Sequence, residues 1–288
     1  MFDTFKDILV PVDFSINTEV AIKHAIELAS GRGSVIHLLH VIESTTKRAF
    51  LSLESGLLAE EYDNTEISRK LMQWKQTIEE TIPYSNVKMH IVEGSVQDII
   101  LESAKKINPQ LIIIGRQRDP GFFSFFSSVY PNELAKLTDC PVLTVTKGSA
   151  NSKIKLIVVP VRSFVPERKI ELIVLFAKIA RARIHLVTLE KNIGSDCTEK
   201  SALLDTFRIL KNVINGTIKY HLLKGRNFPK ATLRYAEKIG ADMILVNPWS
   251  ETQISKLTGK HIQSVLTDSS KLKVLSVEPY HTLNNIQF

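Results

Sequence analysis

Cysteine is scarce in this sequence, with only Cys140 and Cys197 among 288 residues. Two thiols so far apart indicate neither the disulfide framework of a small secreted domain nor a cysteine-rich metal site. No apolar run approaches the roughly 20 residues of a membrane span. The start, MFDTFKDILV, lacks the basic and long apolar segments of a secretory signal. We therefore expect a cytoplasmic protein without a membrane segment.

The common catalytic signatures are also missing. GxSxG, HExxH, CxxC and GxxxxGK[ST] do not occur, which argues against the commonest hydrolase, metalloprotease, redox and P-loop classes. No paired general acid and base stands out, so we predict no catalytic residues. His37 and His185 occupy matching positions beside leucines, which favours buried structural histidines over metal ligands. We predict no metal site.

The charge balance is basic, with a formal net charge of +7 and a pI near 9.3. Clustered cations would indicate a nucleic-acid surface. Here the Lys and Arg residues are scattered among acids on predicted helices, a pattern typical of solvated helix faces. Nucleic acid is therefore an unlikely partner.

The chain contains the same pattern twice. ILVPVDFS at residues 8–15 matches LIVVPVRSF at residues 156–164, and VIHLLHV at 35–41 matches RIHLVTL at 183–189. SAKKINPQLIIIG at 103–115 likewise matches YAEKIGADMILVN at 235–247. Three blocks repeated in order over half the chain indicate a duplicated domain. We predict domains at residues 1–147 and 152–280, the polar linker KGSANS between them, and a tail at 281–288.

Each half alternates short apolar runs with segments of helical spacing. In the first half we predict strands at residues 7–12, 35–42, 87–92, 111–114 and 142–145, and helices at 18–30, 62–82, 96–106 and 128–137. In the second half we predict strands at residues 155–161, 184–189, 218–223, 243–246 and 274–277. Continuously apolar strands that alternate with helices predict an α/β fold, here two tandem doubly wound parallel-sheet domains.

In such sheets, ligands bind outside the carboxyl ends of the strands. In the first half, Asp13, Val41 and Gly115 stand at such ends. A carboxylate at position 13 can accept hydrogen bonds from ribose hydroxyls or from a base amino group. Alternatively, Asp13 or Ser15 caps the following helix. Both readings remain open at this stage.

The stretch GRQRDPGFFSFFSSVYPNELAKLTDCPVLTV at residues 115–145, together with LVPVDFS, resembles the universal stress protein family, and the duplication resembles its tandem members. The resemblance implies a Rossmann-like, adenine nucleotide alpha hydrolase-like fold. Nucleotide-binding members carry Gly, two residues, Gly, nine residues, Gly, then Ser or Thr. From Gly115 these positions hold Arg118, Ser128 and Val129, so only the first glycine is kept. Ser127 and Ser128 still offer hydroxyls.

For the first half, the resemblance implies a possible ATP site at Pro11, Val12, Asp13, Val41, Gly115, Arg118, Ser127 and Ser128. In the second half Arg162 replaces the acid and Asn247 replaces the first glycine, so nucleotide binding there is not expected. No cofactor is firmly predicted.

Two further segments leave alternatives open. Four aromatic rings at residues 122–126 either fold over the vacant site or dock on another surface. Residues 43–64 form either a lid or an inert excursion, with a helix predicted at 49–62.

The sequence thus favours a non-enzymatic tandem universal stress protein that acts in a stress response or in regulation, through a protein partner or a small ligand. The alternative is ATP binding by the first half alone, with slow hydrolysis. The resemblance also implies that the last strands, at residues 142–145 and 274–277, pair within the chain as an internal pseudo-dimer, and that a homodimer can form.

Overall fold

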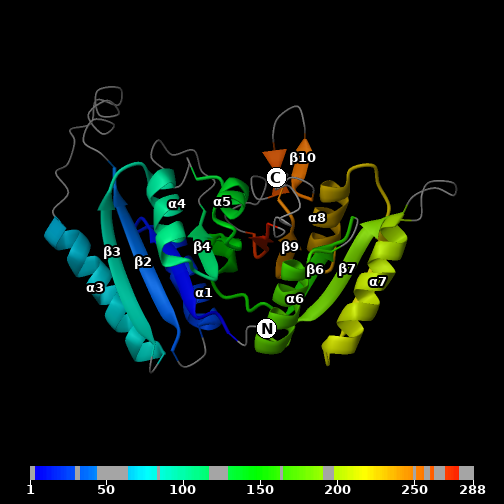
Figure 1. Cartoon of the computed structure of the whole chain (residues 1–288), viewed down its shortest axis with the longest axis horizontal. Coiled ribbons are helices and arrows are strands. Elements are labelled where there is room, and N and C mark those ends of the chain that lie inside the picture. The colour runs from blue at the N-terminus through cyan, green and yellow to red at the C-terminus, as the bar shows by residue number, and fades with distance from the viewer. Residues whose placement is uncertain are drawn as a thin grey trace, which may run out of the picture. The chain divides into compact units, whose positions relative to one another are not determined.

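The computed structural model divides the chain into two compact units, Thr4–Tyr130 and a unit that contains Pro131–Phe288 (Figure 1). The structure describes residues 4–29, 33–43, 64–82, 85–116, 129–162, 165–190, 198–248, 251–255, 260–262 and 270–278. The predicted helix at 49–62 and the aromatic segment at 122–126 lie outside these residues.

The Thr4–Tyr130 unit is built on parallel strands in the order β3-β2-β1-β4. The strands are β1 (Asp7–Val12), β2 (Val35–Ile42), β3 (Asn86–Glu93) and β4 (Leu111–Gly115). The helices are α1 (Ile16–Leu28), α3 (Asn64–Thr81) and α4 (Val96–Ile107). The chain runs from β1 outward to β3 and then returns to β4 on the other side of β1. This reversal of direction creates a switch point between β1 and β4.

The second unit repeats this order and adds strands. The parallel strands β6 (Leu156–Pro160), β7 (Arg183–Leu189), β8 (Ile218–Leu223) and β9 (Met243–Val246) follow the order β8-β7-β6-β9. The helices are α5 (Pro131–Thr138), α6 (Glu167–Ile179), α7 (Thr198–Val213) and α8 (Phe228–Lys238), with a 3-10 turn at Lys147–Ser149. Its switch point lies between β6 and β9.

Two features of this unit come after β9. β10 (Gln253–Ser255) and β11 (Lys260–His261) form a separate antiparallel hairpin. β12 (Lys273–Ser276) pairs parallel with β9 and antiparallel with β5 (Val142–Val145). β5 and β12 are the two last strands for which we predict pairing. Because of this pairing, the boundary between the compact units falls at residue 130, before the linker that the repeat predicts.

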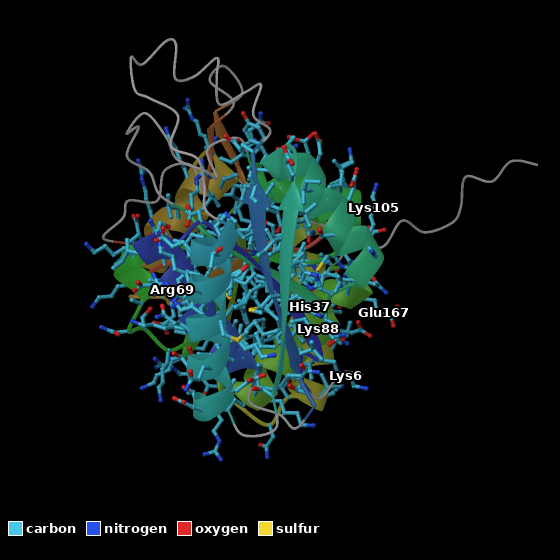
Figure 2. All side chains as sticks on the ribbon, turned by 90° about the vertical axis from the view of Figure 1, so that its left-hand side faces the viewer. Lys6, His37, Arg69, Lys88, Lys105 and Glu167 are labelled. Atoms are coloured by element: carbon cyan, nitrogen blue, oxygen red, sulfur yellow. The ribbon has the colours of Figure 1, made fainter. Side chains whose placement is uncertain are left out.

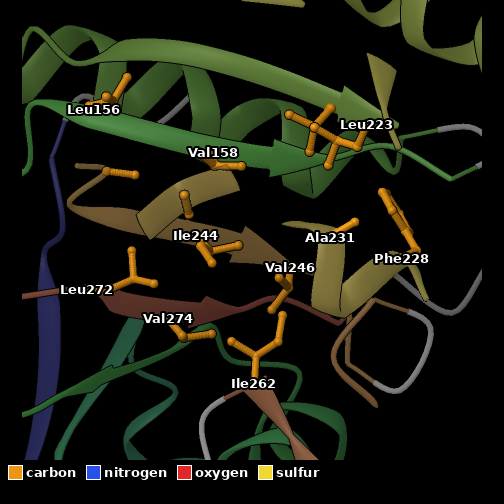
Figure 3. Close-up of a cluster of buried hydrophobic side chains, with 13 residues drawn as sticks. Leu156, Val158, Leu223, Phe228, Ala231, Ile244, Val246, Ile262, Leu272 and Val274 are labelled. Atoms are coloured by element: carbon orange, nitrogen blue, oxygen red, sulfur yellow. The ribbon is translucent and has the colours of Figure 1, made fainter. Parts of the chain in front are cut away.

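The core of the second unit lies between α8 and the strands β6, β9 and β12. Val158, Ile244 and Val274 come from neighbouring strands and are fully buried, and Ala231 of α8 packs on the same cluster (Figure 3). The strands β4, β5, β6, β9 and β12 are buried at every residue. Strands buried on both faces confirm the predicted α/β fold with a doubly wound, mostly parallel sheet.

The element boundaries differ from the prediction mainly at helix starts. α1 begins at Ile16, because the Ser15 side chain accepts a hydrogen bond from the Thr18 amide and caps the helix. α5 begins at Pro131, whose fixed φ suits a first helical position. Among the described helices, none combines the length and the apolarity that crossing a membrane requires.

Candidate functional site

The predicted site residues that the structure describes gather at the switch point of the first unit. Pro11 and Val12 end β1, Asp13 follows it, Val41 lies near the end of β2, and Gly115 ends β4. β1 pairs in parallel with β2 on one side and with β4 on the other, so the carboxyl ends of these three strands lie at one edge of the sheet. Arg118, Ser127 and Ser128 lie outside the described residues, and their roles stay predictions.

Asp13 organises the turn that leads into α1. Its Oδ1 accepts a hydrogen bond from the Ser15 amide at 3.0 Å and another from the Thr18 hydroxyl. The Asp13 amide in turn donates to Thr18 Oγ1 at 3.2 Å. The helix-capping alternative therefore holds for Ser15, and Asp13 supports the same turn. One carboxylate oxygen is engaged in this turn.

An aromatic cluster lies beside Asp13 in the structure. This cluster was not predicted from the sequence. Phe14 has a left-handed backbone with φ of 61°, and its ring lies 4.8 Å from the His40 ring and 5.4 Å from the Trp74 ring, centre to centre. Lys70 Nζ stands 5.3 Å from the Phe14 ring centre. The only sequence signal is that Lys70 and Trp74 are one helical turn apart, on a helix that packs on the sheet.

His40 belongs to the same cluster, and its burial favours the neutral form. Its Nδ1 donates to the Val12 carbonyl at 2.9 Å, and burial lowers the pKa of His40 more than this bond and Asp13 raise it. A neutral imidazole beside Asp13 makes the edge of the sheet less cationic. It also fixes the carbonyl of Val12, one of the predicted contact residues.

Gly115 has a packing reason to be glycine. A Cβ at this position would lie 2.1 Å from the Asn17 carbonyl oxygen and 2.9 Å from the Thr18 nitrogen. These are backbone atoms of the first turn of α1, which cannot yield as a flexible side chain would. The close approach of α1 to β4 therefore requires glycine here, whether or not a ligand binds.

The matching edge of the second unit contains a buried ion pair. Lys169 of α6 and Glu251, which follows β9, are 0% and 3% exposed, and Lys169 Nζ lies 2.7 Å from Glu251 Oε2. Lys169 Nζ also donates to the Pro160 carbonyl at 2.8 Å, and the Asn247 amide donates to Glu251 Oε2 at 2.7 Å. Burial lowers the pKa of Lys169 and raises that of Glu251, and their mutual attraction opposes both shifts.

This ion pair fills the switch point of the second repeat. Pro160 matches Pro11, and Asn247 matches Gly115, so Lys169 and Glu251 use the backbone groups that the first repeat presents at its carboxyl edge. Arg162, which replaces the acid, attracts Glu251 as well. That the second half does not bind a nucleotide stays a prediction.

Sequence reasoning missed the pair, although one signal was present. Lys169, Leu172, Ile173 and Phe176 form the buried stripe of α6 at helical spacing, and the stripe begins with a lysine. Nine residues after each matched proline stand Val20 and Lys169, so a buried apolar position became cationic. Its acidic partner comes from a loop and has no periodic signal.

A polar chain replaces the glycine-rich loop in the second unit. Thr252 Oγ1 lies 3.2 Å from Asn132 Nδ2 and 2.9 Å from His261 Nδ1, which connects α5 to the β10–β11 hairpin. Ser276 of β12 donates to Asn132 Oδ1 at 2.9 Å. These contacts hold the described residues of the β10–β11 hairpin against α5, and α5 against β12.

The repeated histidines have structural contacts. His37 lies with Nε2 3.1 Å from Asp7 Oδ1 and Nδ1 3.1 Å from His90 Nε2. His185 lies with Nδ1 2.9 Å from the Tyr235 hydroxyl. Over the residues that the structure describes, no group of three or more His, Cys, Asp or Glu is arranged to hold a metal ion.

Comparison with known proteins agrees with this geometry. The model of the universal stress protein family matches residues 4–146. Universal stress protein G of Salmonella typhimurium is 30% identical over 144 residues, which cover 49% of this chain and 99% of that protein. Universal stress protein A homolog 1 of Coxiella burnetii is 25% identical over 143 residues, 49% of this chain and 96% of that protein.

Solved structures match along nearly the whole chain. A universal stress protein from Archaeoglobus fulgidus superposes with a TM-score of 0.66 at 16% identity, covering 95% of this chain and 98% of that one. The cytoplasmic domain of a prokaryotic cation chloride cotransporter superposes with a TM-score of 0.55 at 12% identity, covering 96% of both chains. These likenesses show the fold, and the sequence matches show the family. The chain belongs to the universal stress protein family.

Proposed function

We propose that this chain is a non-enzymatic stress-response or regulatory protein that acts by binding, with its ligand site in the first repeat only. The ligand is a small molecule, and a protein partner reads out its presence. The second repeat supports the fold and the strand pairing. A cytoplasmic location and association into a homodimer belong to the same proposal.

The observation that carries this proposal is the buried ion pair in the second repeat. A ligand at that switch point would have to displace Lys169 and Glu251, which are both almost completely buried. Separating the two would leave an uncompensated buried charge, which costs about 3–5 kcal/mol. A cost of this size weakens binding at that position by roughly a hundredfold to several thousandfold, so binding there is disfavoured.

The arrangement of the acids supports binding without turnover. Asp13 Oδ1 is engaged with Ser15 and Thr18, and Glu251 is engaged with Lys169. A general base needs a free position within reach of the proton that it removes. At the second switch point Glu251 has no such position. Asp13 has only Oδ1 in the turn that leads into α1, and we assign its other oxygen to ligand binding.

Adenine nucleotide binding by the first repeat is the second candidate. It is favoured by the position of Asp13, Val41 and Gly115 on adjacent strands at one edge of the sheet, where α/β proteins bind nucleotides. Arg118, Ser127 and Ser128 would complete this site.

The test is a titration with magnesium and ATP, followed by thermal unfolding and by phosphate release. A ligand at 100 times its Kd stabilises the folded chain by about 2.7 kcal/mol. Asp13→Asn is the sharpest variant, because an amide oxygen can still accept from Ser15 and Thr18 while the charge is lost. Asp13→Ala removes the acceptor as well, and Arg162→Ala is the matched control in the second repeat.

The outcomes separate the candidates. Stabilisation that is lost in both Asp13 variants and kept in Arg162→Ala supports nucleotide binding in the first repeat. No stabilisation at millimolar ATP removes the nucleotide candidate and leaves another small ligand. Phosphate release above background that disappears in Asp13→Asn contradicts a non-enzymatic role. Stabilisation that is lost in Arg162→Ala would place the site in the second repeat and contradict the proposal.

A further inference from the structure

Arg116 directly follows β4 at the switch point of the first unit and has an unusual environment. Its side chain is partly buried. Within the described part of the chain, no hydrogen bond or ion pair to its guanidinium is found, and Tyr130 is the titratable group that faces it. A cation at the candidate site thus lacks a matching anion among the described residues.

Such an environment is costly for an arginine. A guanidinium remains charged in proteins, and a buried charge without a partner loses hydration that nothing replaces. Burial accordingly lowers the pKa of Arg116, and the charge interaction with Tyr130 opposes this shift without reversing it. An arginine that merely stabilised the fold would be expected beside a carboxylate. A ligand oxyanion would supply the missing charge, and guanidinium binds phosphate and carboxylate in a bidentate manner.

A second unmatched group lies at the same junction. Asn17, in the first turn of α1, is only 2% exposed, and its Oδ1 has no hydrogen-bond partner within the described part of the chain. The backbone of Asn17 lies against Gly115, the residue before Arg116. An unsatisfied buried acceptor costs about 1–3 kcal/mol. A donor from a bound molecule, such as a hydroxyl or an amino group, would satisfy it.

The Arg116 guanidinium and the Asn17 side-chain oxygen would bind different parts of one ligand. An anion at the start of α1 is disfavoured, because the Asp13 carboxylate already accepts hydrogen bonds there. The anionic part is therefore expected at Arg116, and the part that donates hydrogen bonds is expected near Asn17 and Asp13.

We propose that Arg116 is the anion-recognising residue of the first-repeat site, in place of the lost glycines, for a small ligand that carries an oxyanion and a separate hydroxyl or amino donor. Asn17 receives the donor. This inference rests on the proposed function, specifically on a small-ligand site in the first repeat. It assigns the ligand's chemical class and two residues that recognise it.

Separate probes for the two parts of the ligand test the assignment by calorimetry on the full chain. Pyrophosphate and malonate represent phosphate and carboxylate, and adenosine represents a neutral molecule with hydroxyl and amino donors. The variants are Arg116→Gln and Asn17→Ala, with Arg69→Gln as control. Arg69 is an exposed arginine on α3 of the same unit (Figure 2).

We expect Arg116→Gln to weaken binding of an anion probe by about tenfold or more, since a charge-assisted hydrogen bond contributes about 1.5–3 kcal/mol. Adenosine binding should change less than about twofold in that variant. Asn17→Ala should weaken adenosine binding and change anion binding little. Arg69→Gln should leave the affinity for every probe unchanged. Preference for pyrophosphate over malonate identifies the oxyanion as phosphate, and the opposite preference identifies a carboxylate.

Unfolding in urea gives an independent readout. Arg116→Gln removes a partly buried charge without a partner in the described part of the chain, so the variant without ligand should be at least as stable as the parent chain. A clear loss of stability together with unchanged anion binding would show a structural arginine and overturn the assignment. If ATP stabilises the chain through Asp13 but Arg116→Gln binds pyrophosphate normally, this inference fails and the proposed function stands. If neither pyrophosphate nor malonate binds, this inference fails, and the titration with ATP and the Asp13 variants then tests the proposed function alone.

Discussion

At the scale of single residues, one difference between the repeats is a buried pair of charges in the second repeat. Lys169 occupies a core position of α6 that is valine in the first repeat, and Glu251 neutralises it. Burying two charges is rarely more stabilising than burying two apolar side chains. The ion pair links the Pro160 carbonyl to the Asn247 amide. Pro160 ends β6, and Asn247 directly follows the neighbouring strand β9.

Breaking the Lys169–Glu251 pair should lower the free energy of unfolding much more than breaking an exposed ion pair. We expect Lys169→Met to lower the free energy of unfolding by about 3–5 kcal/mol, because Glu251 is left buried and charged. Lys169→Met with Glu251→Gln should recover most of the loss, since the Gln carbonyl can accept from the Asn247 amide. Arg208→Met, which breaks the exposed Arg208–Asp205 pair, should cost less than about 1 kcal/mol. Urea denaturation measures all four chains.

The pH dependence of the single variant gives a second check. Burial raises the pKa of Glu251, and removal of Lys169 removes an opposing attraction. A carboxyl whose folded-state pKa is raised contributes stability at low pH and loses it as the pH rises through that pKa. The loss in Lys169→Met should therefore be smaller at pH 5 than at pH 8. Equal losses at both pH values, or a small loss throughout, would contradict the buried-charge explanation.

The residues that could be predicted are those that repeat or that lie at strand ends. Asp13, Val41 and Gly115 follow from the rule that ligands bind at the carboxyl ends of parallel strands. The packing role of Gly115 could not be predicted, because the Asn17 backbone that it contacts belongs to another element. Arg116 was missed for the same reason, since its burial without a partner is visible only in three dimensions.

At the scale of elements, the two repeats pair their strands in the same register around histidines. His37 lies opposite Lys88 on β3 (Figure 2). His185 lies opposite Lys219 on β8. The partners of the two histidines differ, because His37 contacts Asp7 and His185 contacts the Tyr235 hydroxyl of α8. Among the described residues, the second repeat thus surrounds its histidine with basic groups and a phenol, and no carboxylate contacts it.

The stability of the chain should fall on acidification because of His185. Burial, together with the nearby cations His221, Lys219 and Arg183, lowers the pKa of His185 to about 4, from 6.5 in the unfolded chain. The unfolded state therefore binds more protons between these values, so the contribution of His185 is full above pH 6.5 and is lost as the pH falls toward 4. We expect a loss of about 1 kcal/mol, because solvent screens this partly exposed ring.

The check is the free energy of unfolding of the parent chain and of His185→Gln between pH 7 and pH 4.5. Gln cannot take up a proton, so the variant should lose less stability over this range. If the two chains lose the same amount, other groups cause the acid sensitivity.

The elements themselves were largely predictable, since long apolar runs and helical spacing alternate clearly. Helix starts were shifted where turn chemistry decides, as at Ser15, whose side chain caps α1. The β10–β11 hairpin was not predicted, because Gln253–Ser255 and Lys260–His261 are too short to show a periodic pattern. Its position depends on contacts of Thr252 with Asn132 and His261, which are distant or irregular in sequence.

At the scale of the whole molecule, the last strands of the two repeats pair with each other. In the unit that contains Pro131–Phe288, β12 completes its antiparallel ladder with β5, the last strand of the first repeat. The register places Val274 opposite Thr144 and Leu275 opposite Leu143. The pairing gives hydrogen-bond partners to backbone groups of β5 and β12. Without it, these groups could pair with a strand of another molecule.

This pairing predicts an intrachain cross-link. In a background with Cys140→Ser and Cys197→Ser, Thr144→Cys with Val274→Cys should form a disulfide on oxidation, because opposed Cα atoms in an antiparallel ladder lie about 4.5–5.5 Å apart. Both changes are small, and Thr144 Oγ1 is a buried hydroxyl without a hydrogen-bond partner in the described part of the chain. Thr144→Cys with Leu275→Cys is the control, since neighbouring residues of a strand point to opposite faces.

Non-reducing electrophoresis and mass spectrometry should show a monomer with one internal disulfide in the first variant and free thiols in the control. The disulfide should raise the free energy of unfolding by about 2–4 kcal/mol, because it restricts the unfolded chain over a long loop. A cross-linked species of twice the chain mass would instead mean that β5 pairs with β12 of another copy. In that case the internal pairing would be wrong, and the edge strands would join two chains by exchange.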